Sequence, residues 1–138
     1  MRLLGPLILL ALLPACGGQP CGVPELVVSP SEARPGEPIE VHPAHSLAPC
    51  VDDRTGSLFR PLPRNTLELD VMLALAGTRP DGGPTIRGEA IPIGQAGYDD
   101  VNGTFELSAP VPERTLPGDY VVFLRQQPEA RGLLRVVR

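Results

Sequence analysis

The stretch Leu-Glu-Leu-Asp-Val-Met-Leu-Ala-Leu, residues 67–75, has the clearest apolar periodicity in the chain. Its large apolar residues recur at every second position, the period at which the side chains of a β-strand share a face. The residues predicted to point inward are Leu67, Leu69, Val71, Leu73 and Leu75. Those predicted to point the other way are Glu68, Asp70, Met72 and Ala74. This stretch therefore predicts a strand with one apolar face.

The same stretch contains residue types that also suit a helix, so the helical alternative has to be weighed. On a helix of 3.6 residues per turn, Glu68 and Asp70 would lie close to the apolar stripe. The rest of the chain disfavours helices as well, because 18 of its 138 residues are Pro and 15 are Gly. The composition excludes a helical bundle and favours an all-β domain.

The sequence on either side of this stretch predicts six further strands. Their ranges are 26–29, 38–42, 85–93, 103–109, 119–125 and 132–137. Between them lie turn pairs such as Pro35-Gly36 and Asn102-Gly103, which supply a fixed or a positive φ. Seven strands at this spacing predict an antiparallel β-sandwich of two packed sheets. Apolar residues make up 42% of the chain, which is enough for one core and one domain.

The first fifteen residues have the three parts of an export signal. Arg2 precedes an apolar run at 3–13, and small residues follow up to Ala15. The run is shorter than the roughly 20 apolar residues that a membrane-spanning helix needs. We therefore predict a signal peptide at residues 1–15, a flexible tether at 16–24 and the folded domain at 25–138.

The end of this leader, Leu13-Pro14-Ala15-Cys16, resembles the lipobox of bacterial lipoproteins. The resemblance implies that a diacylglycerol is attached to the Cys16 thiol and that the leader is cut just before this residue. The protein would then be exported and anchored to the bacterial cell membrane by its lipid, facing the extracytoplasmic side. Two alternatives remain open, namely ordinary secretion with a free Cys16 and a disulfide between Cys16 and another cysteine.

The number of cysteines is consistent with a lipidated Cys16. The chain has three cysteines, so lipidation of one leaves Cys21 and Cys50 to pair in an oxidising compartment. This predicted disulfide would close a loop of about 30 residues, which corresponds to about 3–4 kcal/mol of stabilisation in the chain-entropy description.

The residues after 26 resemble the immunoglobulin-like domains of bacterial surface lipoproteins. The similar segments are 28–30 with 34–39, and 102–105 with 112–120. The resemblance implies an immunoglobulin-like antiparallel β-sandwich in which Tyr120 forms a tyrosine corner, its hydroxyl bonding to backbone upstream. The chain has no Trp, and its expected disulfide lies at one end of the domain, so it differs from antibody domains.

Charge and motifs argue against several classes of function. Twelve Arg against 16 acidic residues give a net charge of -4, which would repel a phosphate backbone, so we expect no nucleic-acid partner. The serines lie in no Gly-x-Ser-x-Gly motif, and Ser46 beside His45 reads as a loop. We therefore expect neither an enzyme nor a cofactor.

The densest group of metal-ligating residue types is His42, His45, Cys50, Asp52 and Asp53. Imidazole and carboxylate suit zinc or copper, but the spacing matches no known motif, and an oxidised Cys50 could not bind metal. A surface loop is the simpler interpretation. A metal-binding surface lipoprotein that uses His42, His45, Asp52 and Asp53 is the alternative function.

Two further surface features have competing interpretations. Asp99, Asp100 and Asn102 match part of a calcium loop, but the acidic residue at loop position twelve is missing, which favours a hairpin turn. Residues 59–64 and Arg79 would suit a partner surface, with scattered charge as the alternative. The function that we expect is a non-catalytic binding or structural module at the cell envelope, contacting a protein, peptide or glycan through loops or a sheet edge.

Overall fold

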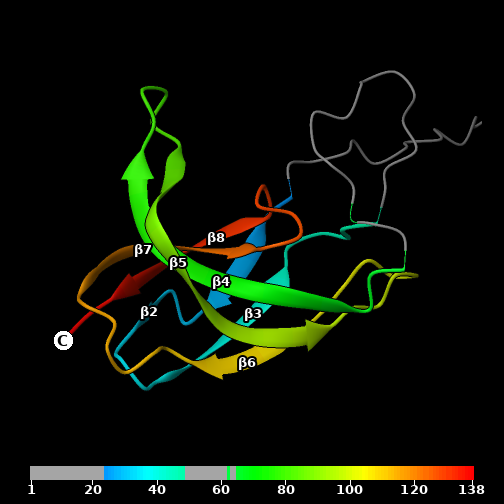
Figure 1. The fold of residues 1–138 in the computed structure, drawn as a ribbon, viewed down its shortest axis with the longest axis horizontal. Helices are drawn as coiled ribbons and strands as arrows, with labels where there is room; N and C mark the ends of the chain where they lie inside the picture. Colours follow the sequence, from blue (N-terminus) through cyan, green and yellow to red (C-terminus); the bar gives the residue numbers. More distant parts are fainter. Residues whose placement is uncertain (1–23, 49–61, 63–64) are drawn as a thin grey trace, which may run out of the picture.

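The computed structural model of the protein describes residues 24–48, 62 and 65–138. All eight strands of this part belong to two sheets, and it contains no helix (Figure 1). The three-stranded sheet has the order β1 (Leu26–Ser29), β3 (Pro38–Pro43) and β6 (Leu107–Pro110). The five-stranded sheet has the order β2 (Glu32–Ala33), β8 (Arg131–Val136), β7 (Gly118–Leu124), β4 (Glu68–Thr78) and β5 (Pro84–Gly97). The prediction of an all-β domain with two sheets is confirmed.

Each of the seven predicted strands is present, with two large differences in extent. The strand predicted at 85–93 is longer, and β5 runs from Pro84 to Gly97. The strand predicted at 103–109 begins only at Leu107, because residues 99–104 form a turn closed by a bridge between Asp99 and Thr104. Both errors come from Gly and Asn residues whose role depends on tertiary pairing.

The eighth strand, β2, is absent from the sequence prediction. It has two residues and pairs in parallel with the end of β8, whereas β1 just before it pairs antiparallel with β3 in the other sheet. The chain thus changes sheet at the cis peptide bond between Ser29 and Pro30. A strand of two residues has no measurable periodicity, so only its partner reveals it.

The core lies between the two sheets. From β4 it contains Leu69, Val71 and Leu73, as the alternation predicted. The prediction was wrong for Leu67 and Leu75, which are 74% and 49% exposed. The strands of the facing sheet have four to six residues, whereas β4 has eleven. Both ends of the stretch 67–75 therefore extend beyond the facing sheet.

The outer face of the five-stranded sheet holds a second buried apolar cluster. It contains Met72 and Ala74 from β4 and Val121 and Phe123 from β7. Ile86 and Ala90 from the first half of β5 pack against this cluster, together with Ala76 of β4. All residues from Tyr120 to Leu124 are consequently buried, as predicted for a central strand.

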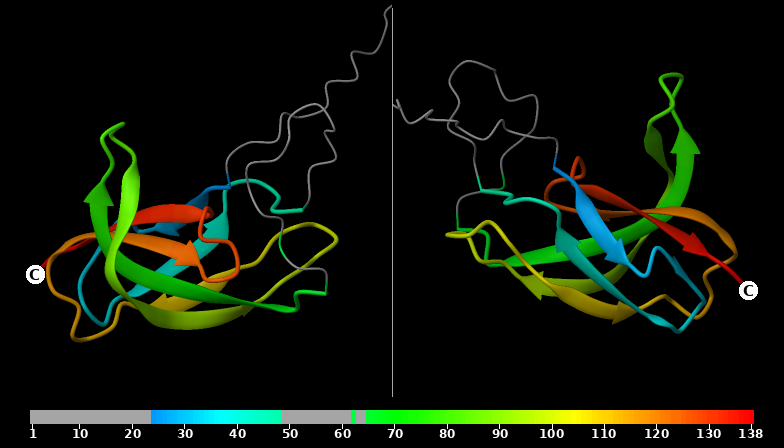
Figure 2. Two further views of the ribbon diagram at one scale, coloured as in Figure 1. Left: turned by 45° about the horizontal axis from the view of Figure 1, so that its top comes forward. Right: turned by 180° about the vertical axis from the view of Figure 1, so that it is seen from behind.

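Two bulges explain how β5 reaches over this face. Val71 pairs with Gly94 but Met72 with Pro92, and Leu73 pairs with Ile91 but Leu75 with Arg87. At each step β5 has more residues than β4, and such bulges bend a strand and increase its twist. The β4–β5 hairpin therefore curls away from the plane of the sheet and rises beside β7 and β8 (Figure 2).

Candidate functional site

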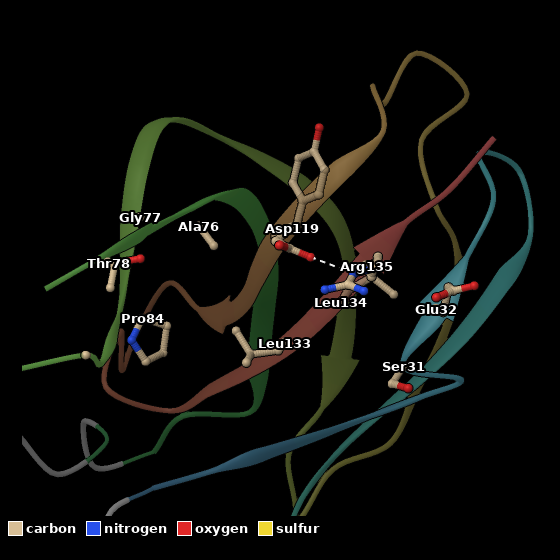
Figure 3. A pocket seen from close by; sticks show the side chains of 12 residues that line it. Ser31, Glu32, Ala76, Gly77, Thr78, Pro84, Asp119, Leu133, Leu134 and Arg135 are labelled. Atoms are coloured by element: carbon tan, nitrogen blue, oxygen red, sulfur yellow. Dashed lines mark hydrogen bonds and ion pairs between the residues drawn. The ribbon is translucent and has the colours of Figure 1, made fainter.

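A hollow of about 440 Å³ lies beside the β4–β5 hairpin on the described surface. The hairpin lines one side, the segment at the start of β2 lines the other, and β7 and β8 lie between them (Figure 3). The side chains that determine its chemistry are Glu32, Thr78, Pro84, Asp119, Leu133 and Arg135. Sequence reasoning singled out none of them as site residues.

An ion pair crosses the hollow between β7 and β8. Asp119 and Arg135 are direct partners in the strand register, and Arg135 Nε donates a hydrogen bond of 2.9 Å to Asp119 Oδ1. The hydrogen bond from Arg135 to Asp119, the charge of Asp119 and the charge of Glu32 raise the pKa of the Arg135 guanidinium. Both side chains are more than half exposed, so the pair contributes little to stability. The sequence did contain a signal for it, since the two strands are adjacent in the chain.

The hollow combines an apolar patch with charged residues. Leu133 is 57% exposed on the outer face of β8, between the ion pair and the hairpin. Thr78 also lines the hollow. The described residues around it include no histidine or cysteine. This arrangement suits contact with another molecular surface.

The predicted metal ligands lie apart from this hollow. His42 lies on the exposed face of β3 and lines a second hollow with Asp99 and Glu106, and its Nδ1 is 3.2 Å from the carbonyl oxygen of Pro43. His45 is exposed in the segment after β3. Within residues 24–48, 62 and 65–138, no group of three or more His, Cys, Asp or Glu side chains is arranged to hold a metal ion.

The other predicted site residues lie outside the described residues. They are Cys16, Cys21, Cys50, Asp52 and Asp53. Lipidation of Cys16, the disulfide between Cys21 and Cys50 and the metal-binding alternative therefore stay predictions.

The loop with Asp99 and Asn102 is a tight turn, which confirms the hairpin interpretation. The Asp99 carboxylate accepts hydrogen bonds from the backbone N–H groups of Val101 and Asn102, both 3.0 Å, and from the Asn102 side chain. These hydrogen bonds lower the pKa of Asp99, and the bond from the Asn102 side chain has the largest effect. Burial raises the pKa of the neighbouring Tyr98 hydroxyl, and the charges of Asp100 and Asp99 raise it further.

Ser46 ties this turn to the segment after β3. Its hydroxyl donates a 2.8 Å hydrogen bond to the carbonyl of Asn102 and accepts one of 3.2 Å from the N–H of Ala48. The N–H of Leu47 donates to the carbonyl of Gly103 at 2.7 Å. The serine beside His45 therefore links two loops.

The tyrosine corner predicted at Tyr120 is present. Its hydroxyl donates a 2.8 Å hydrogen bond to the carbonyl of Leu116, four residues upstream, while the ring is buried in the core. The bond joins the loop before β7 to the start of that strand.

Replacement of Tyr120 by phenylalanine should lower the free energy of unfolding by about 1–2 kcal/mol, because it removes this bond and keeps the buried ring. Chemical denaturation would measure the loss. The matched control is Tyr98→Phe, because the Tyr98 hydroxyl has no hydrogen-bond partner among the described residues, and that variant should change stability by less than about 0.5 kcal/mol. Equal losses in the two variants would contradict the role of the corner.

Comparison with models of known protein families gives no match, and no curated protein matches the chain either. Among the described residues there is no helix with the length and apolarity needed to cross a membrane. The functional assignment accordingly depends on the residues and geometry given above.

Proposed function

We propose that the protein is a non-catalytic, lipid-anchored module at the outer side of a bacterial cell membrane. The observation on which this proposal depends is an export leader that ends in Leu-Pro-Ala-Cys16, directly ahead of an all-β domain. A thiol-linked diacylglycerol with further acylation gives stable attachment, since each buried methylene contributes about 0.8 kcal/mol.

We further propose that the domain is immunoglobulin-like. Three features support this: the three- and five-stranded sheets, the passage of the chain from one sheet to the other between β1 and β2, and the Tyr120 corner before β7. Such sandwiches present loops and sheet edges on a rigid frame, and they host many roles. A binding or structural role at the envelope, toward a protein, peptide or glycan, fits this frame and the surface hollow.

In this proposal the tether would join the domain at the residue before β1. Glu25, the residue before β1, is bridged to Arg131 at the start of β8. The hollow extends from Asp119 and Arg135, near the start of β7 and the end of β8, to Pro84, which Arg131 contacts. A tether of residues 16–24 spans at most about 30 Å. The domain would therefore stay near the bilayer.

Expression of the full chain in a bacterium, followed by membrane fractionation and intact mass measurement, would test the anchor. The native chain should occur in the membrane fraction with the mass of a chain that begins at Cys16, plus acyl chains, less two hydrogens for one disulfide. A Cys16→Ser variant should carry no acyl mass. It should either lose its leader and leave the membrane fraction, or keep its leader uncleaved. An untrimmed, unacylated native chain with three free thiols would overturn the proposal.

A further inference from the structure

The β4–β5 hairpin is an ordered arm that projects beyond the rest of the domain (Figures 1 and 2). Its tip is closed by hydrogen bonds from the N–H of Arg79 to the carbonyl of Gly83, 2.8 Å, and from the N–H of Gly82 to the carbonyl of Arg79, 2.9 Å. Arg131 on β8 holds the arm just behind this turn, because its Nη1 donates a 3.1 Å hydrogen bond to the carbonyl of Pro84, which pairs with Thr78 at the end of the strand ladder. The arm therefore has a defined direction relative to the sheet.

The hollow beside this arm has an excess of negative charge. It contains the carboxylates of Glu32 and Asp119 and one guanidinium, that of Arg135. Asp119 and Arg135 pair with each other, whereas Glu32 has no hydrogen-bond or ion-pair partner for its side chain within the described part of the chain. The exposed Leu133 adds an apolar surface that no described residue covers fully.

The tip of the arm carries an arginine whose charge is opposite to that of Glu32. Arg79 is exposed, and its guanidinium has no ion-pair partner among residues 24–48, 62 and 65–138. The turn that follows, Pro80 to Gly83, contains the carboxylate of Asp81, which accepts a 3.1 Å hydrogen bond from the N–H of Gly83, and Gly82 borders the hollow of its own chain. Arg79 and Glu32, neither of which forms an ion pair among the described residues, thus lie on one chain, at the tip of the arm and in the hollow just behind this tip.

A surface that carries both halves of a contact side by side can pair with itself about a two-fold axis. We propose that a second copy of this chain docks here by reciprocal insertion. The tip of each hairpin enters the hollow of the other copy, Arg79 pairs with Glu32 of the second copy, and Leu133 becomes covered. The contact is small, so the dimer is weak in solution. In this respect the inference rests on the proposed function, because attachment to a common membrane raises the effective concentration of the two copies.

Sedimentation equilibrium of the full chain in density-matched detergent, over a range of protein concentrations, would test this proposal. The native chain should show a reversible monomer–dimer equilibrium that weakens with salt. Glu32→Arg and Arg79→Glu should each weaken dimerisation by at least about tenfold, as expected for a close interfacial charge pair. The double variant, which swaps the two charges, should recover dimerisation to within about threefold of the native chain.

The matched control is Arg114→Glu, an exposed arginine that does not line the hollow, and it should leave dimerisation unchanged. A native chain that stays monomeric at every concentration would overturn the proposal, as would a double variant as weak as either single one. Membrane fractionation tests the lipid anchor independently of dimerisation. A monomeric chain in the membrane fraction would reject the dimer and leave the proposed anchoring intact.

Discussion

Replacement of Gly103 by alanine is expected to lower the free energy of unfolding by about 2–4 kcal/mol, since two costs add at this position. Gly103 has a φ of +66°, a conformation that side chains with a Cβ rarely adopt. A Cβ built there would also collide with Ser46 Oγ and with the backbone nitrogen of Ala48, and would lie 2.9 Å from that of Leu47. The backbone of this segment would have to move, and with it the contact between two loops.

Gly82→Ala separates the two costs. Gly82 has a φ of +85°, but a Cβ there would meet nothing within 4 Å, so only the conformational cost of about 1 kcal/mol applies. Urea unfolding of both variants, followed by circular dichroism, would measure the difference. Similar losses would mean that the close approach of Gly103 to residues 46–48 does not constrain the protein.

Replacement of Phe123 by alanine is expected to cost about 3–5 kcal/mol, because the ring is 6% exposed and its removal leaves a cavity. The ring lies in the second apolar cluster, on the face of β7 that turns away from the space between the sheets. A two-layer sandwich would leave this face in water, and the substitution would then cost little. The size of the loss therefore reports whether the β4–β5 hairpin covers the face.

Leu75→Ala is the control for this measurement. Leu75 lies on the neighbouring strand β4 and is 49% exposed, so its truncation should cost less than about 1 kcal/mol. Thermal and urea unfolding of the two variants would give both values. A Phe123→Ala variant no less stable than Leu75→Ala would show that the hairpin leaves the outer face open in solution.

Local patterns were sufficient to place most of the strands. Alternation located β4 and the buried inner positions Leu69, Val71 and Leu73, and the continuous apolar run from Tyr120 marked a central strand. These predictions succeed because the period of two is a property of neighbouring residues and needs no knowledge of the partner strand. The tyrosine corner belongs to the same class, since its bond spans four residues.

The candidate site was not predictable in the same way. Glu32 and Thr78 are ordinary surface residues in the sequence, and they line one hollow only because the hairpin curls out of the plane of the sheet beside β7 and β8. The bend comes from bulges, which exist only relative to the paired residues of β4. The pair Asp119–Arg135 is the exception, because two consecutive antiparallel strands place such residues opposite each other.

The sequence by itself determined that the chain is built from strands and where most of them lie, because proline, glycine and side-chain alternation act over a few neighbouring residues. Only the tertiary structure decided which apolar faces are covered. Leu67 and Leu75 have the same alternation as Leu73 but extend beyond the facing sheet, while Met72 lies outside the sandwich core and is buried in a cluster with residues of β5 and β7. Burial depends on what packs against a residue, and that partner can come from any part of the chain.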